Sequence, residues 1–359
     1  MLDEKEKYRY TRQISLAEVG LAGQEKLKRA KVLVIGAGGL GCPILQYLTG
    51  AGVGMLGIVD FDEVEKTNLH RQVLYSNADV GRKKAEVAAE KLRLVNDLIT
   101  INLFILKLDY SNASDLFSQY DIIVDGTDNF ACRYIVNDIC IELDKPFVYG
   151  AIYKFEGQVS VFNYKNGPTY RCLFPNTPSP NASPNCSEIG VLPALPGIIG
   201  LLMTNEVLKI ILELGDVLSG QLLQFNSLNT SATFIKFERK INTTVMMKNS
   251  SSYSSFDLHE YELQHYQEVD SSNLNELKTN YHYFLDVRET WENPQLSATN
   301  FIQIPLDQLE QRLIEIPRDK QILVCCQSGG RSKIAIHLLS KYHNYTNLIN
   351  LKNGIKNLI

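Results

Sequence analysis

A glycine cluster between two regular segments constrains the fold of this chain more than any other feature. Residues 32–35 form a continuous, largely β-branched run, which is the pattern of a parallel strand buried on both faces. The cluster Gly-Ala-Gly-Gly-Leu-Gly follows at residues 36–41, then a helical stretch over 42–49 and a short strand over 56–59. This order predicts a strand-helix-strand unit, and with it a doubly wound α/β sheet.

The glycine cluster has the spacing of a phosphate-binding turn. Such glycines let the backbone turn tightly and approach a phosphate, and the following helix points its unpaired N–H groups at the anion. Asp60 ends the second strand, nineteen residues after the last glycine, where a carboxylate accepts hydrogen bonds from ribose hydroxyls. We therefore predict a nucleotide site, although this pattern alone does not separate a dinucleotide from ATP. The glycines of the pattern are Gly36, Gly38, Gly39 and Gly41.

Cationic and amide side chains follow Asp60, the residue that we expect to bind ribose, and they favour a triphosphate ligand. A dehydrogenase needs little extra positive charge here, whereas Arg supplies a bidentate fork and Lys a point charge for phosphate oxygens. The segment DGTDNF then places Asp125 and Asp128 just beyond a strand end, where a carboxylate can hold Mg²⁺ against the phosphates. The polar residues of the two intervening segments, KTNLHRQ and GRKK, include Asn68, Arg71, Gln72, Arg82, Lys83 and Lys84.

The pattern along the rest of the chain indicates two domains. Strand and helix signals alternate up to Pro146 and strand-like stretches follow, which predicts a mixed sheet. A loop rich in Pro, Asn and Ser over 172–196 precedes an apolar helix over 197–214, suited to a core or a subunit interface. Serine and asparagine crowd residues 241–256, and short α/β signals resume beyond them. We predict a first domain over 1–240, a linker over 241–264 and a second domain over 265–359.

Several ordered motifs of the first domain resemble one family. GAGGLG, VDFDEVEKTNLHRQ, GRKKAE and DGTDN resemble the signature of the ThiF/MoeB/HesA (ubiquitin-activating-like) adenylyltransferases, and RYTRQISL, YRCLFP and CSEIGVLPALPGIIG extend the resemblance to roughly residues 5–240. The resemblance implies a Rossmann-like domain that uses MgATP to adenylate the C-terminal glycine of a small ubiquitin-like protein. Such a reaction brings two anions together, so catalysis depends on positioning and charge neutralisation, and the ionised carboxylate needs no general base.

The resemblance assigns roles to residues within these motifs. Asp60 would bind the ATP ribose, Asp128 would coordinate Mg²⁺, and Asn129 lies beside it in the same cofactor-binding motif. Arg12, in RYTRQ, matches an arginine that family members supply from the partner subunit, which implies a homodimer. The residues that the resemblance assigns to the phosphates are Asn68, Arg71, Gln72 and Lys84.

The cysteines of the first domain bear on covalent chemistry and on zinc. Cys186 matches the family cysteine that bonds to the carrier in several members, and a loop thiol near cations can be a nucleophile, but some bacterial members dispense with it. Relatives hold zinc with two CxxC pairs, whereas here Thr169 replaces the first cysteine and residues 230–260 supply no second pair. We therefore predict no structural zinc site. The cysteines that we expect only to pack are Cys42, Cys132, Cys140 and Cys172.

A second anion-binding loop lies near the C-terminus. The run Cys326-Gln-Ser-Gly-Gly-Arg331 follows a buried-looking strand and opens a helix, so its backbone N–H groups and helix dipole can hold a persulfide anion. With LDVRE at 285–289, this segment resembles a rhodanese domain over roughly residues 265–359, without the usual tryptophan near its end. The resemblance implies that Cys326 carries the persulfide sulfur and that Arg331 orients the loop, whereas Cys325 is the buried strand end.

The two domains together predict the activation of a sulfur carrier. An acyl-adenylate made by the first domain would react with the Cys326 persulfide and give a thiocarboxylate. We expect a MoaD-like carrier of molybdenum cofactor biosynthesis, with a ThiS-like carrier of thiamine biosynthesis as the alternative, and a persulfide donor such as a cysteine desulfurase. Other classes are an NAD-dependent oxidoreductase, disfavoured by the cations after Asp60, and a non-catalytic scaffold for a ubiquitin-like partner, disfavoured by intact Arg71, Lys84 and Asp128.

Composition excludes further classes. Lys plus Arg number 36 against 40 for Asp plus Glu, and this net charge of -4 argues against a nucleic-acid binder. The N-terminus is charged, and the apolar run at 191–202 is interrupted by prolines and shorter than the ~20 residues of a membrane span. Seven cysteines are too few for a disulfide scaffold of this length, so we expect a cytoplasmic protein in a reducing compartment.

Overall fold

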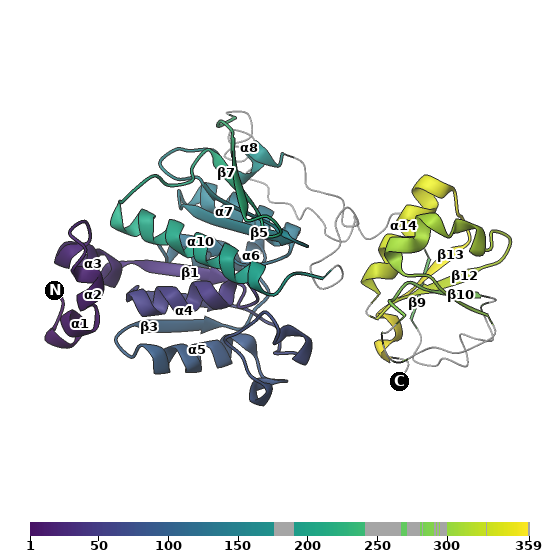
Figure 1. Ribbon diagram of the computed structural model, residues 1–359, viewed down its shortest axis with the longest axis horizontal. Helices are drawn as coiled ribbons and strands as arrows, with labels where there is room; N and C mark the ends of the chain where they lie inside the picture. The colour runs from purple at the N-terminus through teal and green to yellow at the C-terminus, as the bar shows by residue number, and fades with distance from the viewer. Residues whose placement is uncertain are drawn as a thin grey trace. The chain divides into compact units, whose positions relative to one another are not determined.

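The chain forms two compact units, each with its own sheet (Figure 1). The computed structural model describes residues 1–175, 190–240, 267–270, 281, 283–290, 292, 294, 300–327 and 329–357. Described residues up to 240 belong to the first unit and those from 267 onward to the second.

The first unit is built on an eight-stranded sheet of order β3-β2-β1-β4-β5-β6-β7-β8. Strands β1 to β5 run parallel, and β6, β7 and β8 add antiparallel to one edge. The predicted mixed sheet is therefore confirmed. The strands are β1 (Lys31–Ile35), β2 (Met55–Val59), β3 (Thr100–Phe104), β4 (Ile122–Asp125), β5 (Phe147–Tyr153), β6 (Glu156–Phe162), β7 (Gln221–Asn226) and β8 (Ser231–Lys236).

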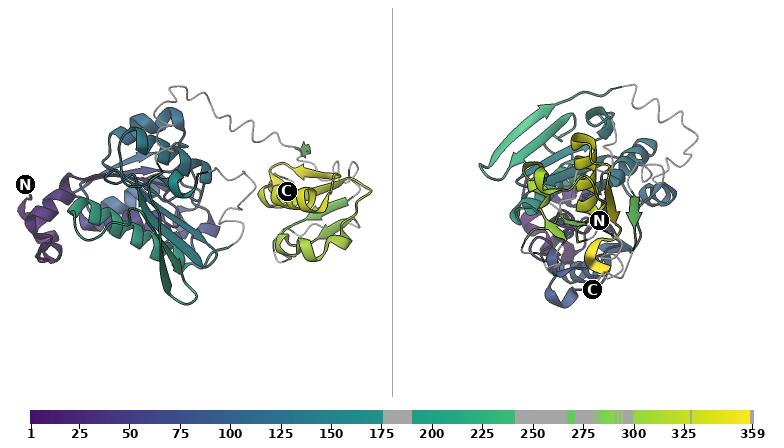
Figure 2. Two further views of the ribbon diagram at one scale, coloured as in Figure 1. Left: turned by 90° about the horizontal axis from the view of Figure 1, so that it is seen from above. Right: turned by 90° about the vertical axis from the view of Figure 1, so that its right-hand side faces the viewer.

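Helices cover both faces of this sheet (Figure 2), because successive strand side chains point to opposite faces. In β1, Val32 and Val34 join one hydrophobic core with helices α4, α5 and α10, whereas Leu33 and Ile35 join a second core with α6 and α7. The helices of this unit are α1 (Glu4–Arg9), α2 (Thr11–Ile14), α3 (Gly20–Arg29), α4 (Gly41–Ala51), α5 (Lys84–Val95), α6 (Tyr110–Ser118), α7 (Phe130–Glu142), α8 (Tyr170–Leu173) and α10 (Ala194–Leu212), with short 3-10 turns η1 (Lys66–Asn68) and η2 (Asn77–Asp79).

Helix α10 is long and apolar enough to cross a membrane by length and composition. In this fold it packs against α4, β5 and β6, and its buried side chains Leu195, Ile199, Met203 and Val207 belong to the core of the first unit. It is therefore a core helix of this domain.

The second unit has a smaller, fully parallel sheet of order β11-β10-β12-β13-β9. Its elements are β9 (Gln267–Val269), β10 (Tyr283–Asp286), β11 (Phe301–Gln303), β12 (Ile322–Cys325), α14 (Gly330–His343) and β13 (Leu348–Leu351), with 3-10 turns η3 (Leu306–Gln311), η4 (Leu313–Glu315) and η5 (Gly354–Asn357). Strand β12 is buried along its whole length, as the apolar run before Cys326 predicts.

Candidate active sites

The glycine turn joins β1 to α4 at the carboxyl edge of the first sheet. Gly36 has φ +88°, and a Cβ on Gly41 would lie 1.9 Å from the Gly36 carbonyl oxygen, so both positions require glycine. A Cβ on Gly38 would instead face Gln72 Nε2 at 3.5 Å, and one on Gly39 would lie 3.8 Å from Arg71 Cδ. The structure thus brings these predicted phosphate-binding side chains against the turn.

Asp60 holds the glycine turn to the end of β2. Its carboxylate accepts hydrogen bonds from the N–H groups of Ala37 at 2.7 Å and Asp62 at 2.8 Å. Burial raises the pKa of Asp60, and Lys84 and the two backbone N–H groups offset part of that rise. Each oxygen receives one of these bonds, which leaves lone pairs for ligand hydroxyls.

In the segment from Asn68 to Gln72, the side chains of Arg71 and Gln72 lie against the same turn. Asn68 Oδ1 accepts from the Glu65 N–H at 3.3 Å, and Arg71 Nη1 donates to the Thr67 carbonyl at 3.2 Å. Gln72 is buried, and its Oε1 has no hydrogen-bond partner among the described residues. An orphaned buried acceptor beside a glycine turn fits a nucleotide, which brings hydroxyl and amino donors to such a place.

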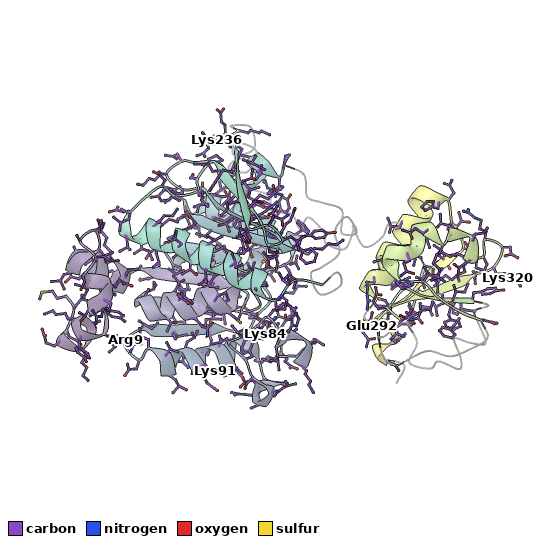
Figure 3. All side chains as sticks on the ribbon, in the orientation of Figure 1. Arg9, Lys84, Lys91, Lys236, Glu292 and Lys320 are labelled. Carbon is purple, nitrogen blue, oxygen red and sulfur yellow. The ribbon has the colours of Figure 1, made fainter. Side chains whose placement is uncertain are left out.

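Lys84 is the most buried of the three cations in the GRKK motif. Arg82 pairs with Glu90 and Lys83 with Glu63, and both side chains are more than one-third exposed. Lys84 begins α5, its side chain is 8% exposed, and its Nζ lies 3.2 Å from Asp62 Oδ2 (Figure 3). A buried ammonium group near the glycine turn suits phosphate, because charge interactions are stronger away from water.

The DGTDN motif forms the neighbouring loop after β4. The Gly126 N–H donates to the Ile35 carbonyl at 2.8 Å, and a Cβ on Gly36 would lie 3.0 Å from the Gly126 oxygen, so the two loops touch. Asp128 and Asn129 are exposed, and Asn129 Oδ1 accepts from the Cys132 N–H at 3.3 Å as the cap of α7.

The described residues contain no group of three or more metal-binding His, Cys, Asp or Glu side chains. Asp128 alone fits a Mg²⁺ ion that takes most of its other ligands from phosphate oxygens and water, as this ion does at nucleotide sites. That Asp128 is the protein's ligand for Mg²⁺, with phosphate oxygens and water as the other ligands, therefore stays a prediction.

The Asp125–Arg133 pair supports this loop and was not predicted from the motifs. Asp125 is fully buried and accepts from the N–H and O–H groups of Thr127 at 2.9 and 2.6 Å. Arg133 Nε lies 3.6 Å from Asp125 Oδ2, and its Nη2 donates to the Thr127 carbonyl at 3.1 Å. The sequence feature that could have indicated this pair is the lone arginine in the otherwise apolar stretch FACRYIV.

Arg12 lies at the other end of the first unit. It is exposed on α2, and its neighbour Gln13 donates to the carbonyl of Ala51, the last residue of α4. The glycine turn lies at the opposite, N-terminal end of α4. Figure 3 likewise separates Arg9 from Lys84, and Arg9 contacts the carbonyl of Val95 at the far end of α5. Helices of 11 and 12 residues span roughly 16–18 Å, so Arg12 does not reach the turn of its own chain.

The remaining cysteines of this unit are mostly core residues. Cys42, Cys140 and Cys172 are buried as predicted, whereas Cys132 is half-buried. Thr169 caps α8 and its Oγ1 lies 3.3 Å from Cys172 Sγ. Cys186 lies outside the described residues.

In the second unit, Cys326 begins a tight loop between β12 and α14. Its sulfur is buried and accepts a hydrogen bond from the Gly329 N–H at 3.1 Å. Gly329 has φ +90°, a conformation that favours glycine. Ser332 Oγ lies 3.5 Å from the sulfur and donates to Asn350 Oδ1 at 2.7 Å. The Gly329 N–H is a donor that an anionic sulfur on Cys326 would accept, and the contacts of Ser332 and Asn350 at this loop were not predicted.

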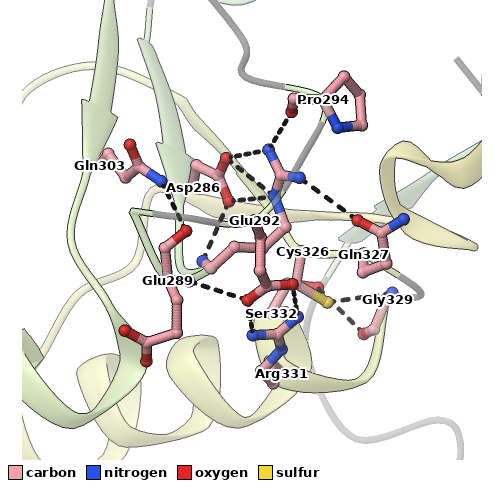
Figure 4. A network of polar contacts seen from close by, with 11 residues as sticks. Asp286, Glu289, Glu292, Pro294, Gln303, Cys326, Gln327, Gly329, Arg331 and Ser332 are labelled. Carbon is pink, nitrogen blue, oxygen red and sulfur yellow. Dashed lines mark hydrogen bonds and ion pairs between the residues drawn. The ribbon is translucent and has the colours of Figure 1, made fainter. Parts of the chain in front are cut away.

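Two arginines lie at this loop, and Figure 4 labels one of them, Arg331. Arg288 is fully buried, pairs with Asp286 at 2.7 Å and donates to Gln327 Oε1 at 3.3 Å, so it anchors the loop. Arg331 Nη2 donates to Glu292 Oε2 at 2.7 Å. Glu292 was not predicted, because the glutamates of ETWEN carry no spacing signal.

These features define a doubly wound α/β protein with a glycine turn between β1 and α4, joined to a small parallel α/β unit with a cysteine loop. The family model "ThiF family" matches residues 10–245, and that of the "Rhodanese-like domain" matches residues 271–359. This chain belongs to the ThiF family and carries a C-terminal rhodanese-like domain, as the motif resemblance predicted.

Curated relatives cover both parts of the chain. The adenylyltransferase and sulfurtransferase MOCS3 of Aedes aegypti is 39% identical, over 95% of this chain and 83% of its own length. A probable molybdopterin-synthase adenylyltransferase of Porphyra purpurea is 38% identical, over 97% and 91%. A sulfur carrier protein adenylyltransferase of Thermus thermophilus is 50% identical over 62% of this chain and 84% of its own length.

Solved structures support the fold of the first unit. Escherichia coli MccB, determined with ATP, superposes with a TM-score of 0.54 at 24% sequence identity, covering 65% of this chain and 72% of MccB. At this identity the likeness shows the fold alone.

Proposed function

We propose that this protein uses ATP to adenylate the C-terminal glycine of a ubiquitin-like sulfur carrier and then transfers sulfur to it, giving a thiocarboxylate. The observation that carries the proposal is the presence in one chain of two different loops suited to anions, the glycine turn at Gly36–Gly41 and the cysteine loop at Cys326. The carrier class that we favour is MoaD-like, in molybdenum cofactor biosynthesis, because near-full-length relatives include a probable molybdopterin-synthase adenylyltransferase.

Adenylation requires the carrier carboxylate to approach the α-phosphate of ATP. Arg71 and Gln72 lie against the glycine turn, and Lys84 lies beside Asp62. These three side chains would hold the phosphates together with Asn68, while Asp60 would accept hydrogen bonds from the ribose hydroxyls. A Mg²⁺ ion held by Asp128 would neutralise phosphate charge, which lowers the repulsion that the carboxylate meets. The carboxylate is already ionised at neutral pH, so no residue has to remove a proton.

Sulfur transfer then uses the second loop. The persulfide anion on Cys326 attacks the acyl carbon, a carbon–sulfur bond forms, and AMP leaves with the electron pair of the broken C–O bond. The product is an acyl disulfide, and attack by a second thiolate on the Cys326 sulfur releases the thiocarboxylate and leaves a new disulfide. Cys186 is our candidate for that thiol, and a cysteine desulfurase is the class of enzyme that we expect to load Cys326.

We further propose a homodimer in which Arg12 completes the site of the partner subunit. Arg12 cannot reach the turn of its own chain, yet it is exposed and free to meet another. The side of α10 that faces away from the core exposes Ile198 and Leu201, an apolar surface suited to a subunit contact. Because the reaction consumes ATP and depends on reduced thiols, we place the protein in the cytoplasm.

ATP–pyrophosphate exchange tests the adenylation step. Purified full-length protein should exchange labelled pyrophosphate into ATP when a MoaD-like carrier ending in Gly-Gly is present, and a carrier lacking the last glycine should not support it. Exchange with a ThiS-like carrier but not with a MoaD-like carrier would instead indicate a role in thiamine biosynthesis. Failure of exchange with every such carrier would contradict the proposed adenylation.

A further inference from the structure

Glu292 forms a two-pronged ion pair with Arg331. Arg331 Nη2 donates to Glu292 Oε2 at 2.7 Å and Nη1 donates to Oε1, and each side chain is only 14% exposed. Glu292 is itself held by a turn, because its Oε1 accepts from the Glu289 N–H at 2.9 Å. Partial burial raises the pKa of Glu292, but Arg331 and the Glu289 N–H outweigh it and lower that pKa below its ordinary value. Glu292 is therefore ionised at neutral pH.

The sheet brings this pair to the cysteine loop. Strands β10 and β12 are parallel neighbours, with Asp286 opposite Cys325, so the segments that follow them leave the same edge side by side. The segment after β10 carries Glu292, and the loop after β12 runs from Cys326 to Arg331. Figure 4 shows the Arg331 and Glu292 side chains pointing toward one another at this loop.

The charge balance of the loop follows from this contact. Two guanidinium groups lie at the loop, and the charge of Arg288 is already balanced by its ion pair with Asp286 at 2.7 Å. Arg331 lies within the loop itself, and a guanidinium in that place would attract a dianion such as thiosulfate. Glu292 supplies a compensating negative charge that is largely shielded from water and so acts strongly on a nearby anion.

We propose that Glu292 selects the sulfur donor of this loop, by neutralising Arg331 so that doubly charged donors are disfavoured and singly charged persulfide donors are accepted. This inference rests on the proposed sulfurtransferase function of Cys326. Glu292 acts through Arg331 and is a positioning and specificity residue.

Two small donors of similar shape separate charge from reactivity. With thiosulfate, the Cys326 thiolate attacks the outer sulfur, the new S–S bond forms as the old one breaks, and sulfite leaves with the electron pair. With methanethiosulfonate the same step releases methanesulfinate. Sulfur is transferred without any external oxidant or reductant, and the two donors differ by one negative charge. Cyanide then removes the sulfur as thiocyanate and restores the thiolate.

The test compares kcat/KM for both donors in the full-length protein and in Glu292→Gln. We expect the variant to raise the value for thiosulfate on the order of tenfold, and that for methanethiosulfonate by less than about threefold. Glu292→Asp keeps the charge and should return the ratio toward that of the wild type. Glu315→Gln is the matched control, because it breaks an Arg–Glu pair of the same form with Arg312 on the exposed surface, and it should leave both values unchanged.

Each outcome is decisive. An unchanged thiosulfate-to-methanethiosulfonate ratio in Glu292→Gln, with Cys326 still forming a persulfide, would overturn this inference and leave the proposed function standing. Equal losses with both donors would show that Glu292 only supports the loop, which also overturns it. Absence of a Cys326 persulfide in the wild type with any donor would contradict the sulfurtransferase function itself. If Glu292→Gln does not fold, the same ratio is measured in Glu292→Ala. A higher thiosulfate-to-methanethiosulfonate ratio than in the wild type would support the inference, and an unchanged ratio would overturn it.

Discussion

The ammonium group of Lys84 lies 3.2 Å from the carboxylate of Asp62, although only 8% of the Lys84 side chain is exposed. Asp62 also donates its N–H to Asp60, so one short segment links the proposed ribose-binding carboxylate to the proposed phosphate-binding ammonium group. Lys84 is therefore held in place before a nucleotide arrives, and preorganised charge is the main source of catalysis in reactions of this type.

This relationship predicts different effects for two adjacent lysines. Lys84→Met should lower carrier-dependent ATP–pyrophosphate exchange about 100-fold, because it removes a preorganised cation from the phosphates. Lys83→Met is the matched control and should change exchange by less than about threefold, because Lys83 pairs with Glu63 on the exposed side of the same motif. Equal losses in both variants would show that the motif acts only through its net charge.

The position of Arg12 predicts complementation between subunits. Arg12→Ala and Asp128→Asn should each abolish exchange as separate homodimers. Mixed in equal amounts by refolding or co-expression, they should recover about one quarter of wild-type exchange, because half the dimers are mixed and each has one intact site. No recovery in dimers verified to be mixed would mean that Arg12 does not act across the interface.

The two neighbouring cysteines of the second unit should behave differently. Cys326→Ala should abolish sulfur transfer while leaving pyrophosphate exchange intact. Cys325 is buried in β12, where burial raises its pKa well above the ordinary value and keeps it protonated. Cys325→Ala should therefore retain sulfur transfer at the price of about 1 kcal/mol of stability, as measured by urea unfolding with a persulfide assay alongside. Loss of exchange in Cys326→Ala would contradict the division into two sites.

Asp79 predicts part of the acid sensitivity of the first unit. Its own burial raises its pKa, but hydrogen bonds from Lys91 and Ser76 outweigh this and lower the pKa to about 2. A lowered folded-state pKa means that this stability is present above the ordinary value, 3.8, and is lost as pH falls toward 2. Asp79→Asn should reduce the free energy of unfolding by up to about 1 kcal/mol at pH 7 and flatten its decline in that range, whereas an unchanged decline would contradict this assignment.

The first unit was largely predictable because its site lies in contiguous motifs. The run before Gly36 and the acid at Asp60 fix the ends of β1 and β2, and parallel strands place those ends together. Arg133 was not predictable in the same way, because its contact with Asp125 depends on how α7 packs against β4. Short helices α1 and α2 were also missed, since helices this short depend on tertiary contacts, here of α1 with α2 and of α2 with α3.

The second unit was less predictable for the same physical reason. The cysteine loop is contiguous, so its nucleophile and its arginine were found. Glu292 and Asn350 come from segments far along the chain, and only the pairing of β10 and β13 with β12 brings them to the loop. The sequence pattern does not indicate which residues of these strands lie opposite one another.

Formation of a carrier thiocarboxylate tests the central claim most directly. Full-length protein, ATP, Mg²⁺, a MoaD-like carrier and a persulfide donor are incubated with a thiol reductant, and the intact carrier is weighed by mass spectrometry. Replacement of one carboxylate oxygen by sulfur, dependent on ATP and lost in Cys326→Ala, is the predicted result. A carrier that is adenylated but never gains sulfur, although Cys326 carries a persulfide, would contradict the account.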